Sequence, residues 1–196
     1  MGLNYTMAKK KSDKPKLEIE LIPSTCHYSN VRTALKTKVW DKIRFIIYEN
    51  AEHKCQICSQ TGLEQGYKHR VECHEIWEYD DERKIQKLIG LIALCPTCHQ
   101  AKHIGRSFAI GRKDIVINKL MDINNWSEEK TLEIISEAFE INKERSKHNW
   151  KLDISLLKMP PHNLDINSRP KRKYKKNPLA KKRKKKTKLK SRPKRK

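Results

Sequence analysis

The chain has 196 residues, of which 45 are Lys or Arg and 23 are Asp or Glu, so its formal net charge is +22. This length allows one compact domain with tails, or two small domains at most. No apolar run approaches the roughly 18 residues that a transmembrane helix needs, and the N-terminus lacks the hydrophobic stretch of a signal peptide. We therefore expect a soluble intracellular protein with no membrane partner.

The positive charge is concentrated at the two ends of the sequence. Residues 169–196 include 18 Lys or Arg and no acid, whereas Leu17–Ser168 holds 22 basic and 22 acidic residues. This pattern predicts a disordered basic arm over 1–16, a single α+β domain over 17–158 and a disordered polybasic tail over 159–196. Such arms bind nucleic acid by releasing counterions from its phosphates. The tail residues that we expect to bind nucleic acid are Lys181, Lys182, Arg183, Lys184, Lys185 and Lys186.

Four segments of the central region carry secondary-structure signals. Leu17–Ile22 alternates weakly and could be a short strand, and 39–50 has apolar residues at the helical spacing of three and four. Ser127, followed by two acids, predicts the N-cap of a helix that ends near Arg145. Residues 150–154 alternate like a final strand. The apolar positions that we expect to be buried on the Ser127 helix are Leu132, Ile135, Phe139 and Ile141.

Two Cys-x-x-Cys pairs lie 36 residues apart, Cys55 with Cys58 and Cys95 with Cys98. Without export, paired cysteines indicate metal ligands rather than disulfides. Two pairs brought together complete the tetrahedral shell of a structural Zn²⁺. Pro96 suits the first position of a helix, because its missing N–H costs nothing there. The sequence therefore predicts one zinc ion held by all four thiolates.

Three histidines accompany these cysteines. His74 lies between the pairs, and His99 and His103 follow the second pair. In a helix that begins near Pro96, positions 99 and 103 share one face, so both imidazoles could bind one ion.

The pattern C-x2-C, a histidine on a hydrophobic strand, then L-C-x2-C-H-x3-H resembles the HNH, or ββα-metal, nucleases with a four-cysteine zinc. The resemblance runs from Cys55 to His103 and implies a small treble-clef module over about 51–105, with flanking helices and short strands. It implies that His74 is the general base of phosphodiester hydrolysis. It also implies that His99, with His103, binds a second divalent cation (Mg²⁺, Mn²⁺, Ni²⁺ or Zn²⁺) for catalysis.

Two positions depart from the family pattern. Where the family has Asp or His as a metal ligand before the base, this chain has Cys73; strand alternation offers Glu72 as the ligand instead, and Cys73 could also be a buried filler. Where the family has an asparagine that orients the base, this chain has Gly90.

Three functions follow from these features. The first is a metal-dependent endonuclease acting on nucleic acid, with DNA the expected substrate. The second is a catalytically silent zinc protein that binds nucleic acid, which the departures at Cys73 and Gly90 favour. The third is an interaction module whose tail docks on an acidic protein or ribosomal RNA. The resemblance suggests a bacterial or phage cytoplasm, and a nuclear location if the source is eukaryotic.

Overall fold

The computed structural model of the protein describes residues 14–158, which form a mixed α+β structure of six α-helices and a three-stranded sheet. The predicted basic arm lies outside the described residues except for 14–16, and the predicted tail, including 181–186, lies wholly outside them. No helix within 14–158 is long and apolar enough to cross a membrane. In chain order the helices are α1 (Val31–Ala34), α2 (Thr37–Asn50), α3 (Pro96–Lys102), α4 (Ile104–Ala109), α5 (Lys113–Asn124) and α6 (Glu128–Arg145).

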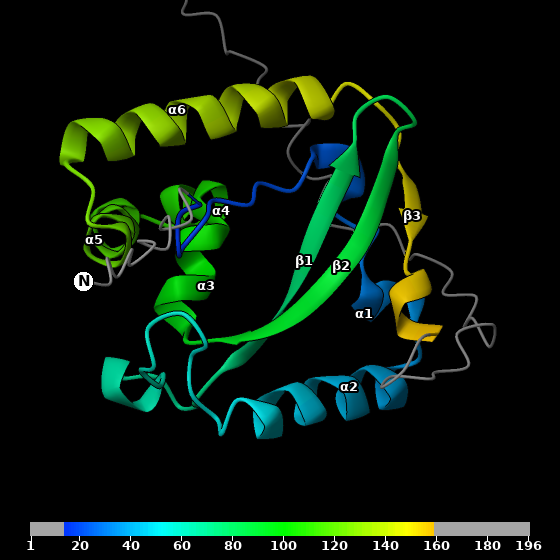
Figure 1. The fold of residues 1–196 in the computed structure, drawn as a ribbon, viewed down its shortest axis with the longest axis horizontal. Coiled ribbons are helices and arrows are strands. Elements are labelled where there is room, and N and C mark those ends of the chain that lie inside the picture. Colours follow the sequence, from blue (N-terminus) through cyan, green and yellow to red (C-terminus); the bar gives the residue numbers. More distant parts are fainter. Residues whose placement is uncertain (1–13, 159–196) are drawn as a thin grey trace, which may run out of the picture.

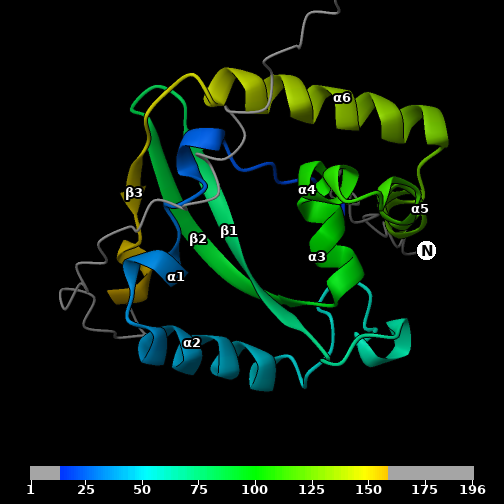
Figure 2. The same ribbon diagram turned by 180° about the vertical axis from the view of Figure 1, so that it is seen from behind.

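The sheet is built on one long antiparallel hairpin. Strand β1 (Glu72–Asp80) pairs with β2 (Ile85–Leu94). The short strand β3 (Lys151–Asp153) pairs in parallel with the first three residues of β2. The register shifts between the pairs Ile76–Gly90 and Trp77–Leu88, which leaves Ile89 as an extra residue in β2, as expected of a bulge where a strand bends. Figures 1 and 2 show the hairpin as a curved ribbon between two groups of helices. The predicted strand at 150–154 is thereby confirmed, with narrower bounds.

A hydrophobic cluster lies on each side of the hairpin. The first cluster gathers three of the paired cysteines with apolar residues of α3, α4, α5 and α6. The second gathers Trp40 and Ile43 of α2 with Trp77 and Leu88 of the hairpin. Helix α2, which confirms the helix predicted at 39–50, therefore packs on the side away from the cysteines. The paired cysteines sit in the core that α3 and α5 build.

Helix α6 begins as the sequence predicts but is less buried than its pattern suggests. The Ser127 side chain accepts a hydrogen bond from the backbone N–H of Lys130, and the helix ends at Arg145. Of the four positions expected to be buried, only Ile135 is; the others are exposed by 36–53%. The helix rests along one edge of the molecule (Figure 1), so a single narrow stripe, Thr131 with Ile135, meets the core.

The segment Leu17–Ile22 does not form the short strand that its alternation suggested. Hydrogen bonds from individual residues hold this segment against the helices instead. The Asn124 side chain exchanges two hydrogen bonds with the backbone of Leu17, at 3.0 and 2.9 Å, and the Glu20 N–H donates to the Lys102 carbonyl at 2.9 Å. This segment thus runs across α3 and α5 as a strap, and it carries the Glu20 side chain to the hairpin.

Candidate metal centres

The four paired cysteines converge into one cluster, as predicted. Their Sγ atoms all lie within 4.8 Å of one another, and Cys58 Sγ is 3.6 Å from the sulfurs of both Cys95 and Cys98. Zn–S bonds of about 2.3 Å in a tetrahedron place sulfurs about 3.8 Å apart. The cluster therefore has the donor set and the spacing of a site that could hold zinc.

The first pair sits on a tight turn that hydrogen bonds connect to the hairpin. The N–H of Cys55 donates to the Gln60 carbonyl, and the N–H of Ser59 donates to the Cys55 carbonyl. The Gln56 N–H and side-chain oxygen bond the Ala93 backbone at 3.0 and 2.8 Å. Gly62 closes the following turn, where a Cβ would lie 2.3 Å from the His69 carbonyl oxygen, so only glycine fits. These contacts hold the turn next to the end of β2, from which the second pair starts.

The second pair starts α3 and has polar support. Cys95 is the N-cap residue of the helix, with Pro96 at its first position as predicted. The Gln65 amide nitrogen lies 3.2 Å from Cys95 Sγ, and its oxygen accepts from the backbone and hydroxyl of Thr97. Hydrogen bonds from Cys58, Cys95 and Cys98 lower the pKa of the Cys55 thiol far below its ordinary value. The neighbouring thiols Cys55 and Cys58 instead raise the pKa of Cys95 and of Cys98, so a metal ion that binds all four as thiolates would displace protons from these two.

His74, His99 and His103 form a second cluster beside the first. Each offers a ring nitrogen within 4.8 Å of the others, and the ring centroids are 4.9 to 5.2 Å apart. His74 comes from β1, His99 from the middle of α3 and His103 from its C-cap. The predicted convergence of 99 and 103 is confirmed, and His74 joins them as a third nitrogen donor at the same distance.

Two carboxylates fix the orientation of these rings from outside. His74 Nε2–H donates to Glu20 Oε2 at 2.9 Å, and the other Glu20 oxygen accepts from Lys102 Nζ. His99 Nδ1–H donates to Glu72 Oε2, whose partner oxygen accepts from His69 at 2.9 Å. Metal-binding histidines almost always donate their second ring N–H to a carboxylate or carbonyl in this way.

The hydrogen bonds also determine which nitrogen atoms are left over. Because His74 donates through Nε2, its Nδ1 carries a lone pair in the neutral ring, and this atom is buried with no hydrogen-bond partner. The whole His74 residue is only 1% exposed. A buried unpaired acceptor costs about 1–3 kcal/mol, a cost that a bound cation would remove. By the same logic Nε2 of His99 is the free nitrogen of that ring.

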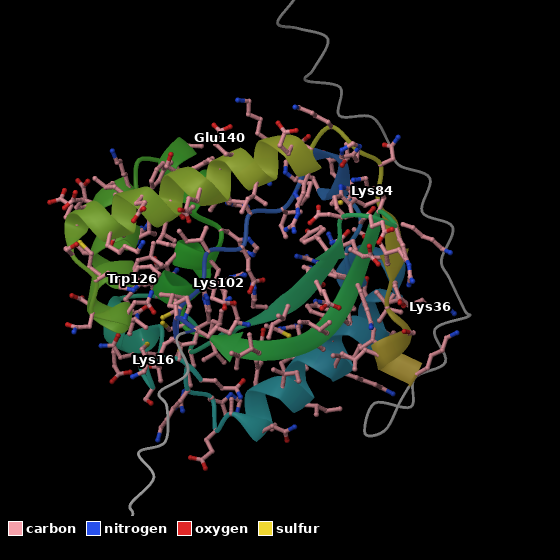
Figure 3. All side chains as sticks on the ribbon, turned by 45° about the horizontal axis from the view of Figure 1, so that its top comes forward. Lys16, Lys36, Lys84, Lys102, Trp126 and Glu140 are labelled. Atoms are coloured by element: carbon pink, nitrogen blue, oxygen red, sulfur yellow. The ribbon has the colours of Figure 1, made fainter. Side chains whose placement is uncertain are left out.

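Burial favours the neutral rings of His74 and His103, the form that metal binding needs. Burial of the imidazole lowers the pKa of His103 to about 3, with the charges of His99 and His74 acting in the same direction. Burial also lowers the pKa of His74, although the hydrogen bond to Glu20 opposes this. For Glu20, burial alone would raise the pKa, but the His74 hydrogen bond and the nearby positive charges outweigh it and lower the pKa. Figure 3 labels Lys102, the counter-ion of Glu20, near the middle of the molecule.

The structure separates the two candidates for the ligand position before His74. Glu72 lies at the histidine cluster through its contact with His99. Cys73 instead packs with the second hydrophobic cluster, and its burial raises the pKa of the thiol to about 12. Of the two, only Glu72 reaches the histidines. Gly90 pairs with Ile76 in the register that pairs Ile92 with His74, so its missing side chain belongs to the His74 face of the hairpin.

Glu20 and Lys102 are the site residues that sequence reasoning missed. Glu20 is separated from His74 by 54 positions and from Lys102 by 82. The only available signal was the position of Glu20 as one of two acids among the apolar residues of Leu17–Ile22, which is a weak one. No protein family, no curated protein and no solved structure matches this chain in the comparisons with known proteins.

Proposed function

We propose that this chain is a metal-dependent endonuclease that hydrolyses phosphodiester bonds of nucleic acid, with DNA the expected substrate, through a treble-clef module of the HNH type. The observation that carries the proposal is the pairing of two metal-ligand clusters on one short helix. Cys95 and Cys98 belong to the thiol cluster, and His99 and His103 belong to the imidazole cluster. A structural zinc beside a separate nitrogen-donor site is the division of labour that such an enzyme requires.

The geometry favours His74 as a third metal ligand over the general base that the family resemblance implies. Its ring lies 5.2 Å from that of His99 and 4.9 Å from that of His103, centroid to centroid. One ion fits among the three rings, but a phosphate group between His74 and the other two does not. In addition, His74 is almost fully buried and its Nε2 is occupied by Glu20, so it has no access to solvent water.

The site would supply hydrolysis in the following way. His74, His99 and His103 would hold a divalent cation, which would supply a more acidic bound water and a positive charge beside the phosphate. Imidazole donors suit Zn²⁺ or Ni²⁺ better than Mg²⁺. The chain's own carboxylates, Glu20 and Glu72, orient the rings, and Lys102 balances the charge of Glu20. The open side of the cluster lies at His99, Glu72 and His69, whose side chains are exposed by 25%, 35% and 46%.

The test is cleavage of supercoiled plasmid and of labelled oligonucleotides by the full chain with added Mg²⁺, Mn²⁺, Ni²⁺ or Zn²⁺. We expect nicking with at least one ion and its loss in His99→Ala, while His148→Ala, an exposed histidine outside both clusters, cleaves normally. Metal analysis should find the thiol-bound zinc retained in His99→Ala. Cleavage that survives in His99→Ala would come from a contaminant, and failure of every ion to support cleavage would refute the nuclease.

A catalytically silent nucleic-acid-binding protein is the second candidate, and Gly90 is the observation that favours it. The His74 face of β2 has no side chain at Gly90 that could hydrogen-bond to a reacting group. This candidate predicts that the protein binds two metal ions per chain and shifts DNA on a gel without cutting it. The plasmid assay therefore separates the two candidates directly.

A further inference from the structure

A groove opens next to the histidine cluster, between the second half of α2 and the segment that leads into β1. It has a volume of about 450 Å³, within the range of roughly 300–1,000 Å³ that is typical of ligand sites. Its lining includes Arg44, Phe45, Tyr48, His69, Arg70 and Glu72. The lining thus combines two arginines, two neighbouring aromatic rings, two histidines, one valine and one acid.

Glu72 connects the groove to the proposed metal site. One of its carboxylate oxygens accepts from His99 in the cluster, and the other accepts from His69, which also lines the groove. A single side chain therefore separates the groove from the nearest metal-ligand candidate. A strand that passes through the groove would continue onto the open side of the cluster.

The aromatic wall has the features of a stacking platform. Phe45 is 50% exposed, although it lies on a helix whose other large apolar residues include the buried Trp40 and Ile43. The Arg44 guanidinium carbon lies 4.3 Å from the centre of the Phe45 ring, and Tyr48 meets this ring edge-on at 5.9 Å. Asp41 accepts from Arg44 Nε at 2.8 Å and holds the guanidinium in that place. Proteins that bind single strands combine such exposed rings and arginines, because every base has a π-face.

The second arginine is available for a phosphate. Arg70 is exposed, and although its backbone carbonyl accepts from the Gly62 N–H, no hydrogen bond or ion pair connects its guanidinium to another residue within 14–158. The remaining cation of the groove, Arg44, is already neutralised by Asp41. An arginine without a counter-ion and an exposed ring that line the same groove offer partners for the phosphate and the base of one nucleotide.

We propose that this groove binds one unstacked nucleotide of the substrate strand, with the base on Phe45 and the phosphate on Arg70. This inference rests on the proposed nuclease function and names the path by which the strand reaches the histidine cluster. It also commits the protein to a strand that is single or locally opened, since a base paired within a duplex cannot stack on a side chain.

The experiment measures binding without cleavage, so it does not depend on activity. Full-length protein is titrated into a labelled single-stranded oligonucleotide that carries the fluorescent base 2-aminopurine, without added divalent cation, over a series of salt concentrations. Arg70→Gln removes the charge and Phe45→Leu removes the ring, whereas Phe45→Trp keeps an aromatic face. Lys36→Gln, at the opposite end of α2 and labelled in Figure 3, is the matched charge control.

We expect Phe45→Leu to weaken binding about tenfold and to remove the fluorescence quenching that stacking causes, and Phe45→Trp to restore both. Arg70→Gln should reduce the slope of log affinity against log salt by about one, and Lys36→Gln should leave it unchanged. Equal slopes for Arg70→Gln and Lys36→Gln, with unchanged quenching in Phe45→Leu, would overturn the proposal. If cleavage fails but these variants behave as expected, the groove stands without the nuclease; if cleavage occurs and they bind as the wild type does, the groove falls and the nuclease stands.

Discussion

We predict that Glu20 supports both the stability of the protein and the affinity of the histidine cluster for the metal ion proposed to bind there. Its carboxylate bridges His74, which is 1% exposed, and Lys102, whose side chain is 6% exposed, and is itself 15% exposed. Removing one partner of a buried ion pair costs about 3–5 kcal/mol, because the other charge is left uncompensated. For a chain of this size, that loss lowers the melting temperature by about 6–20 °C. We therefore expect Glu20→Ala to be strongly destabilised, as measured by circular dichroism on heating.

The metal-binding role needs a variant that leaves no stranded charge. The double substitution Glu20→Gln with Lys102→Met removes both charges while an amide remains opposite His74. We expect it to recover most of the stability lost in Glu20→Ala. An amide is a weaker acceptor than a carboxylate, so affinity at the histidine cluster should still fall by about 10–100-fold, the usual effect of losing an outer-shell carboxylate. Competition with a coloured chelator measures this affinity.

The reasoning fails if the double variant binds the second ion as tightly as the wild type does. That result would mean that Glu20 only neutralises Lys102 and does not orient His74. A melting temperature of Glu20→Ala within about 2 °C of the wild type would equally contradict the buried ion pair, because it would imply a cost well below that expected for the stranded Lys102 charge.

Three further predictions concern other positions. Cys98→Ser should abolish zinc binding and unfold the protein, since structural zinc contributes about 10–16 kcal/mol, more than or close to the whole stability of a typical domain; zinc release with retained far-ultraviolet dichroism would contradict this. Cys73→Ala should leave the metal content unchanged, whereas Glu72→Ala should lower the affinity of the histidine cluster for the proposed second ion about tenfold or more. Equal effects of the two substitutions on metal content would restore Cys73 as a ligand candidate. Burial raises the pKa of Glu75 to about 7, so the folded state holds a proton that the unfolded state loses near pH 4.5. The free energy of unfolding should therefore fall as pH rises from 4.5 to 7. In urea denaturation at pH 8, Glu75→Gln should raise the free energy of unfolding by about 1–3 kcal/mol. The exposed Glu78→Gln serves as its control.

The local parts of this structure could be predicted from short-range patterns. The spacing of the cysteine pairs, Pro96 at the start of α3 and Ser127 at the start of α6 each depend on chemistry within a few residues. The structure confirms the convergence of the four thiols and of His99 with His103. These features need no knowledge of what packs against them.

The features that could not be predicted depend on contacts between distant segments. Strand alternation shows that Glu72 and His74 share a face, but it does not show which face meets α3. The sequence therefore leaves Cys73 as a candidate ligand, and only its packing in the second hydrophobic cluster separates it from the histidines. The buried stripe predicted for α6 was too broad, because the spacing of apolar residues does not show how many elements pack against a helix. The strap at Leu17–Ile22 forms no regular element of secondary structure, and its contact with the histidine cluster is made by the Glu20 side chain.

The position of α3 predicts the order in which the two proposed metal sites form. Cys98 and His99 are adjacent in the sequence, and the seven-residue helix that carries them is too short to be stable alone. An ion held by the thiol cluster would tie the first turn of this helix to the turn at Cys55, and we expect His99 and His103 to face His74 on the hairpin only after that. We therefore expect loss of a thiol-bound ion to remove the imidazole site, whereas loss of an imidazole-bound ion should leave the thiol site intact, because the thiols draw no ligand from β1. A protein that releases its second ion at low chelator concentration and its first only on unfolding would show this hierarchy, and simultaneous release of both ions would exclude it.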